Sequence, residues 1–106
     1  MTDQPTVTTA AAAARLPHSP GRISALVLNS PGLEVRWYAP PNPDPQGPHD
    51  RDEVYVVVTG SGEFEREGVR AKFGPGDLLF VAKGEQHRFV GHTKDTGVWV
   101  VFGPGK

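Results

Sequence analysis

The chain has 106 residues, a formal net charge of −1, 13 Gly, 11 Pro and no Cys. A chain of this length builds one domain around a single core. The balanced charge favours neither nucleic acid nor a membrane surface as a partner, and the lack of Cys excludes disulfides and thiolate ligands. Any metal site must therefore use His, Asp or Glu.

Residues 1–22 are predicted to be a flexible N-terminal tail that precedes one domain over residues 23–106. The tail carries a run of alanines, Ala10–Ala14, but lacks the basic and long apolar regions of a secretory signal. No later segment is apolar for long enough to cross a bilayer. We therefore expect a cytoplasmic protein with no membrane partner.

Short apolar runs separated by turn residues predict strands along the rest of the chain. Ile23–Asn29 and Leu33–Ala39 flank a Ser-Pro-Gly turn, and Glu53–Thr59 is rich in β-branched residues. Further strands are predicted in the hairpin Glu63–Phe73 and at Leu78–Val81, His87–Val90 and Val98–Phe102. No segment after the tail has helical periodicity, which predicts an all-β domain of about eight short strands, a small barrel or sandwich.

The alternation of side chains predicts which residues share the interior. On the strongest strand it places His49, Arg51, Glu53 and Tyr55 on one face, and on a later strand it places His87 with Phe89. A barrel can bring these two faces together. The preceding loop, Pro40–Pro48, is predicted to be stiff and extended, and the same alternation turns Gln46 away from His49.

The strand Glu53–Thr59 is apolar on both faces over its second half. Both faces are then expected to be covered, and in a domain this small the second cover is expected to be another subunit. The sequence therefore predicts a homodimer.

Two windows of the chain resemble the motifs of the cupin superfamily. The spacing from His49 to Glu53 to Gly60 matches the second half of the motif G-x5-H-x-H-x3,4-E-x6-G. Gly76, Gly84 and His87 match the motif G-x5-P-x-G-x2-H-x3-N. The resemblance covers residues 33–102 and implies a single jelly-roll (RmlC-like) β-barrel of antiparallel strands.

The chain also departs from both motifs. Pro41 replaces the leading glycine and Gly47 the first histidine of the first motif, while Ala82 and Gly91 replace the proline and asparagine of the second. The resemblance implies His49, Glu53 and His87 as ligands of a divalent transition metal, and it leaves the fourth ligand position empty.

Two imidazoles and one carboxylate suit Fe, Zn, Mn, Ni or Cu, and such a triad leaves open positions for catalysis. The structural alternatives are an ordinary surface histidine at position 49, a hydrogen-bonded barrel histidine at position 87 and an ion pair between Arg51 and Glu53. The candidate substrate-binding residues are Tyr55, Trp37, Phe89 and Arg51.

The resemblance favours a metal-binding protein that acts on a small organic molecule, with oxygen-dependent, dioxygenase-like oxidation ranked first. A metal-dependent isomerase or lyase is one alternative. The others are a non-catalytic ligand-binding or dimerisation module and a metal-free enzyme that uses Tyr55 or His87 as acid or base.

Overall fold

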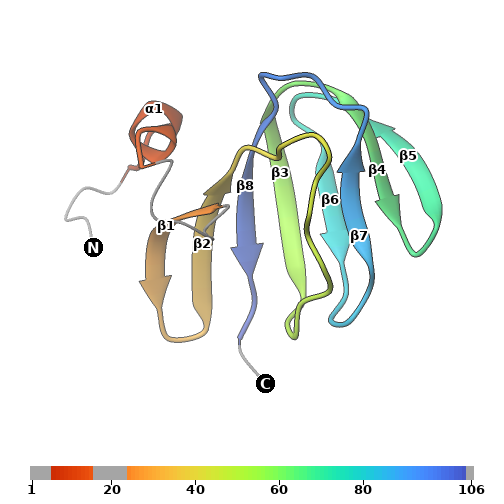
Figure 1. Ribbon diagram of the computed structural model, residues 1–106. Helices are drawn as coiled ribbons and strands as arrows, with labels where there is room; N and C mark the ends of the chain where they lie inside the picture. The colour runs from red at the N-terminus through yellow and green to blue at the C-terminus, as the bar shows by residue number, and fades with distance from the viewer. Residues whose placement is uncertain (1–5, 16–23, 105–106) are drawn as a thin grey trace.

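The computed structural model describes residues 6–15 and 24–104, whose strands form two antiparallel sheets (Figure 1). The five-stranded sheet has the order β1-β2-β8-β3-β6, and the three-stranded sheet has the order β5-β4-β7. The elements are α1 (Thr9–Ala13), β1 (Ser24–Ser30), β2 (Leu33–Tyr38), β3 (Glu53–Thr59), β4 (Gly62–Arg66), β5 (Val69–Phe73), β6 (Leu78–Val81), β7 (His87–Val90) and β8 (Gly97–Phe102). The prediction of an all-β barrel of about eight strands is confirmed.

The predicted strand bounds are close to the observed ones. The bounds of β3, β6 and β7 are those predicted, because charged or glycine-containing turns flank each apolar run. β2 ends one residue early, at Tyr38, since Ala39 precedes a proline and leaves the ladder. β1 extends one residue further than predicted, to Ser30, and Ile23 lies outside the described residues.

The core lies between the two sheets and is largely aromatic. Phe89 of β7 is at its centre, with ring centroids of Tyr55, Phe64 and Phe73 within 5.3 Å. The buried cluster comprises Tyr38, Tyr55, Val57, Phe64, Phe73, Val81, Phe89, Val98, Val100 and Phe102. Each such side chain contributes about 1.5–3 kcal/mol when fully buried, so this cluster fixes the barrel that holds the site.

A short helix interrupts the segment predicted to be a flexible tail. The side chain of Thr8 caps α1 by accepting a hydrogen bond from the backbone N–H of Ala11. Ala12 is fully buried in a second apolar cluster with Val27 and Trp37, and α1 lies beside β1 and β2 in Figure 1. Alanines allow this close approach, while residues 1–5 and 16–22 of the predicted tail lie outside the described residues. No helix among the described residues is long and apolar enough to cross a membrane.

Candidate metal centre

The three predicted metal ligands lie together inside the barrel. Glu53 begins β3, His49 lies four residues before it in the loop, and His87 begins β7 on the opposite sheet. One potential ligand atom from each residue lies within 4.8 Å of the other two. The resemblance to cupins therefore identified three residues that the fold does bring together.

His49 and Glu53 form a close pair. Nδ1 of His49 lies 2.5 Å from Oε2 of Glu53. This hydrogen bond raises the pKa of His49 above its usual 6.5, although partial burial acts in the opposite direction. In the absence of a metal, the imidazole thus donates a proton to a carboxylate whose side chain is fully buried, while the His49 side chain is 35% exposed.

His87 presents its other nitrogen to the same carboxylate. Its Nδ1 lies 3.0 Å from the backbone oxygen of Glu85, to which it donates, so the neutral ring carries a lone pair on Nε2. This Nε2 lies 3.3 Å from Oε2 of Glu53. Two electron-rich atoms then face each other, which is favourable only when a cation or a proton lies between them.

Two buried atoms of the triad also lack hydrogen-bond partners. Among the described residues, Oε1 of Glu53 and Nε2 of His87 are fully buried and have none. A buried polar atom without a partner costs about 1–3 kcal/mol, and more when it is charged. A divalent metal ion would satisfy both atoms, so the residues present fit a metal.

Arg51 does not pair with Glu53, contrary to the structural alternative considered from the sequence. Its Nη1 donates to Oε1 of Glu34 at 2.8 Å, and its guanidinium lies 4.4 Å from the ring centroid of Phe102. Arg36 binds the other oxygen of Glu34. The alternative fails because Glu34, on the adjacent inner face of β2, offers a more exposed and accessible carboxylate than Glu53 does.

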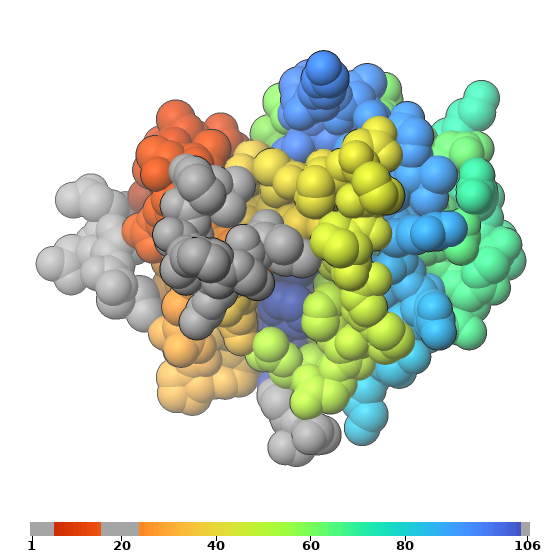
Figure 2. Space-filling view, in the orientation of Figure 1, coloured from red at the N-terminus to blue at the C-terminus, as the bar shows by residue number. Residues whose placement is uncertain are grey.

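The loop between β2 and β3 is fastened to the barrel by Asp44. This loop crosses the front of the molecule in Figure 2, as the yellow and yellow-green segment. Asp44 is buried, and its carboxylate accepts hydrogen bonds from the hydroxyl of Tyr38 and from the backbone N–H of Phe89. Sequence reasoning missed this residue, and its two proline neighbours signal only a stiff backbone.

Gln46 points into the barrel, so the prediction that it turns away from His49 is wrong. Its Oε1 accepts a hydrogen bond of 2.7 Å from the hydroxyl of Tyr55, and its Nε2 donates to Asp44 at 2.8 Å. Strand alternation does not apply here, because residues 39–52 form no strand and the Asp44 carboxylate sets the direction of the side chain.

Tyr55 links Gln46 to the triad. Burial raises the pKa of Tyr55 well above its usual 10, and the adjacent Glu53 carboxylate raises it further. The hydroxyl therefore keeps its proton at neutral pH and acts as a hydrogen-bond donor rather than as a base.

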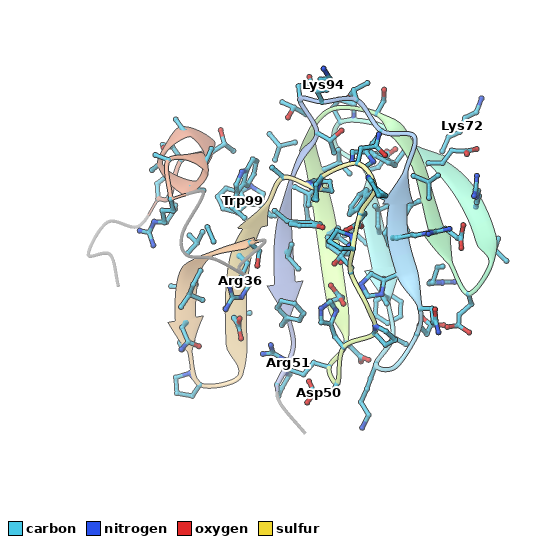
Figure 3. All side chains as sticks on the ribbon, in the orientation of Figure 1. Arg36, Asp50, Arg51, Lys72, Lys94 and Trp99 are labelled. Atoms are coloured by element: carbon cyan, nitrogen blue, oxygen red, sulfur yellow. The ribbon has the colours of Figure 1, made fainter. Side chains whose placement is uncertain are left out.

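The predicted substrate-binding residues do not form one group. Tyr55 and Phe89 lie in the core next to the triad, whereas Trp37 lies in the second apolar cluster, edge-on to Trp99. Figure 3 shows Trp99 near α1 and Arg51 towards the opposite end of β8. Trp37 therefore faces the outside of the barrel, because it alternates with the inward-facing Tyr38.

Two cavities border the triad from different sides. A polar cavity of about 330 Å³ includes His87, Gln46, Gln86 and Arg88 in its lining. A smaller one of about 70 Å³ includes His49 and again Gln46. The polar cavity can hold a small organic molecule beside His87, and Gln46 lines both spaces.

The position at which the first motif expects its first histidine is open. A Cβ atom built on Gly47 meets no heavy atom within 4 Å. A side chain at position 47 would therefore meet no neighbour at its Cβ.

Known proteins resemble the chain over much of its length. A family model described as a cupin domain (Cupin_2) matches residues 37–103. An uncharacterized protein of Streptomyces coelicolor (strain ATCC BAA-471 / A3(2) / M145) is 36% identical over 61 residues, which cover 58% of either chain. The match thus spans little more than half of the length of this curated relative.

Solved structures share the fold. One named "putative mannose-6-phosphate isomerase", from Ralstonia eutropha JMP134, is 26% identical, with a TM-score of 0.62 over 83% of this chain and 89% of the other. An uncharacterized conserved protein with a double-stranded beta-helix domain from Klebsiella pneumoniae is 18% identical, with a TM-score of 0.72 over 98% and 93% of the two chains. The family model covers more than half of the chain and both motifs lie within its match, so the protein belongs to the cupin family.

Proposed function

We propose that this cupin binds a divalent transition metal through His49, Glu53 and His87 and acts on a small polar organic molecule. Oxygen-dependent oxidation is the first reaction to test. The observation that carries the proposal is the pair of buried, unpartnered atoms, Glu53 Oε1 and His87 Nε2, which lie beside the third ligand candidate.

The donor set defines what a metal would contribute. Two imidazoles and one carboxylate on one side of an ion leave positions for substrate or dioxygen, a pattern typical of non-haem Fe(II) oxygenases. Zn, Mn, Ni and Cu also accept these donors, so the identity of the metal is a matter for experiment.

The surrounding residues would bind and orient the substrate. The Glu85 carbonyl holds the His87 ring with Nε2 directed towards the site. The hydroxyl of Tyr55 keeps its proton and donates it to Oε1 of Gln46, which holds the Gln46 amide in the lining of the polar cavity. Arg88, which is half-exposed in that cavity, lies 3.8 Å from the carboxylate of Glu65, so the lining presents groups of both charges to a polar substrate.

Metal-assisted isomerisation is a second candidate reaction. The 26% identity to the protein named as an isomerase supports it, and proton transfer without dioxygen needs the same open coordination position. The predicted cytoplasmic location and the predicted homodimer are also part of this proposal, and the outer face of the five-stranded sheet is the candidate dimer interface.

Metal binding is tested by calorimetry and elemental analysis of the full chain supplied separately with Fe(II), Mn(II) and Zn(II). Wild type is expected to bind one ion per chain, while His87→Ala and Glu53→Gln are expected to lose it. Glu65→Gln is the matched control, because this carboxylate lines the polar cavity but lies outside the triad. Equal metal content in all four proteins, or none in wild type, would contradict the proposal.

The reaction class is tested with the metal-loaded protein and a panel of small hydroxy acids, diols and sugar acids. Oxygen consumption that depends on the triad supports oxidation. Anaerobic conversion of the substrate supports isomerisation or lyase chemistry. Metal binding without turnover of any compound would favour a ligand-binding module over an enzyme.

A further inference from the structure

Two arginines share the carboxylate of Glu34 on the inner face of β2. Nη1 of Arg51 donates to one oxygen of this carboxylate at 2.8 Å, and Nε of Arg36 donates to the other at 2.5 Å. Among the described residues, neither arginine forms an ion pair with a second carboxylate. Two guanidinium groups opposite one carboxylate leave one positive charge unmatched.

This excess charge acts on Glu34 itself. Burial acts to raise the pKa of the Glu34 carboxyl, but the two arginines outweigh burial and lower this pKa below its usual 4.5. The three side chains are between 17% and 25% exposed, so water screens their charges less than it screens charges on an open surface. A second anionic group at this place would therefore be attracted by the charge that Glu34 leaves unmatched.

The unmatched charge borders the smaller cavity, the one beside His49. Nη1 of Arg36 donates to Oγ of Ser24 at 3.3 Å, and the guanidinium of Arg51 lies 4.4 Å from the ring centroid of Phe102. Ser24 and Phe102 both line this cavity, whose volume is about 70 Å³. The centroids of the Phe102 and His49 rings are 5.4 Å apart. Each arginine thus contacts one residue of the cavity wall, and one of these residues also contacts a predicted metal ligand.

Several donors of the two guanidinium groups have no protein partner. Among the described residues, Nε and Nη2 of Arg51 and Nη2 of Arg36 form no hydrogen bond. A guanidinium offers five N–H groups in a planar fork, and this fork matches the two oxygens of a carboxylate. The pair therefore has donors left for a second carboxylate after Glu34 has been bound.

The arginines around the larger, polar cavity are arranged differently. Glu65 lies 3.0 Å from Arg70 and 3.8 Å from Arg88, and Arg70 also lies 3.7 Å from Glu63. Two carboxylates here match two arginines, and these arginine side chains are about half exposed. This group is therefore balanced and solvated, whereas the excess charge lies on the side of His49.

We infer that Arg36 and Arg51 together bind the carboxylate of a small substrate, so that the site selects anionic molecules. The inference rests on the proposed function and narrows its substrate to a compact organic acid. A water molecule needs about 10–15 Å³ of cavity volume, so a cavity of about 70 Å³ accommodates a carboxylate with a few further atoms. The carboxylate would lie at the arginines and the rest of the molecule beside His49.

Binding of lactate and of its uncharged analogue lactamide, followed by NMR titration of the Zn(II)-loaded full chain, tests this inference. Wild type is expected to bind lactate more tightly than lactamide. Arg36→Gln and Arg51→Gln are each expected to weaken lactate binding by about tenfold or more and to leave lactamide binding unchanged. Arg70→Gln is the matched control, because this arginine also pairs with a glutamate but lines neither cavity beside the triad.

Glu34→Gln supplies a test of the opposite sign. This substitution removes the competing carboxylate, keeps both arginines and is expected to strengthen lactate binding, whereas a purely structural ion-pair group would give no such gain. It also decides the question if an arginine variant fails to fold, because unchanged or weaker lactate binding by folded Glu34→Gln overturns the inference.

Two further results would overturn it. One is a wild type that binds lactate no better than lactamide, and the other is equal lactate binding by wild type and folded arginine variants. Metal content, measured in every variant, separates this inference from the proposed function. A wild type that takes up no metal contradicts the proposed function, and the same comparison of lactate with lactamide is then made on the metal-free chain.

Discussion

Restoring the missing histidine, with Gly47→His, is expected to strengthen metal binding. Gly47 lies two residues before His49, and a Cβ atom at this position meets no heavy atom within 4 Å. Its backbone lies outside the left-handed region, so a side chain introduces no strain there. The protein therefore has both the space and the backbone conformation for a side chain at this position, and the motif spacing predicts that the new imidazole turns towards the triad.

The gain in affinity follows from the number of ligands. Ordering one more side chain costs about 0.5–1.5 kcal/mol. Residues that merely hydrogen-bond to a metal ligand already change the affinity for the metal by about 10–100-fold. We expect the dissociation constant to fall by at least this factor, which corresponds to about 1.4–2.7 kcal/mol. With excess metal, the same free energy stabilises the folded protein and raises Tm by about 5–20 °C.

Calorimetric titration with Zn(II) and Mn(II), together with thermal melts with and without metal, measures this effect. Gly74→His is the matched control. Gly74 also has open space around a Cβ atom and an ordinary backbone conformation, but it belongs neither to the triad nor to a motif position that supplies a ligand. If folded Gly47→His binds metal no more tightly than wild type and the control do, position 47 does not face the triad. The equivalence between Gly47 and the missing motif histidine would then be wrong.

Three other substitutions test the surroundings of the site. Gln46→Ala removes the acceptor of the buried Tyr55 hydroxyl and is expected to cost about 1–3 kcal/mol in urea unfolding; no loss would mean that the loop is not held as described. Gly60→Ala is expected to cost about 3 kcal/mol or more, because its φ is +92° and a Cβ would lie 2.3 Å from Oγ1 of Thr96; a loss below about 1 kcal/mol would contradict this reasoning. Burial acts to raise the pKa of Glu34, but Arg36 and Arg51 outweigh burial and hold this pKa below its usual 4.5. The stability that the ionised Glu34 provides is therefore present above pH 4.5 and is lost as the pH falls through its folded-state pKa. Glu34→Gln should therefore be less stable than wild type at pH 7, by about 1 kcal/mol, with a difference that shrinks in acid; a difference independent of pH would refute the assignment.

The regular part of the fold could be predicted from the sequence because strand propensity and turn residues agree along most of the chain. In β3, β-branched residues, period-two alternation and a following glycine turn all indicate the same element. Two spaced motifs identified His49, Glu53 and His87, although 33 residues of chain separate Glu53 from His87. Motif spacing succeeds here because Glu53 and His87 each begin a strand, where the backbone fixes the side-chain direction, and His49 lies only four residues before Glu53.

The loop before β3 could not be predicted in the same way. The inward direction of Gln46 depends on the buried carboxylate of Asp44, and that carboxylate is held by Tyr38 from β2 and by the N–H of Phe89 from β7. These contacts join segments distant in sequence, and local pattern carries no information about them. The ion pair of Arg51 with Glu34, 17 residues away, was missed for the same reason.

The hydrogen bond from Phe89 to Asp44 also bears on how the protein avoids aggregation. β7 is an edge strand of its sheet, and an edge N–H that faces outward can pair with a strand of another molecule. The carboxylate of Asp44 accepts a hydrogen bond from this N–H and so holds the loop against the strand edge. Loss of Asp44 would therefore do more than loosen the site, because it would expose an open strand edge on which chains could add to one another.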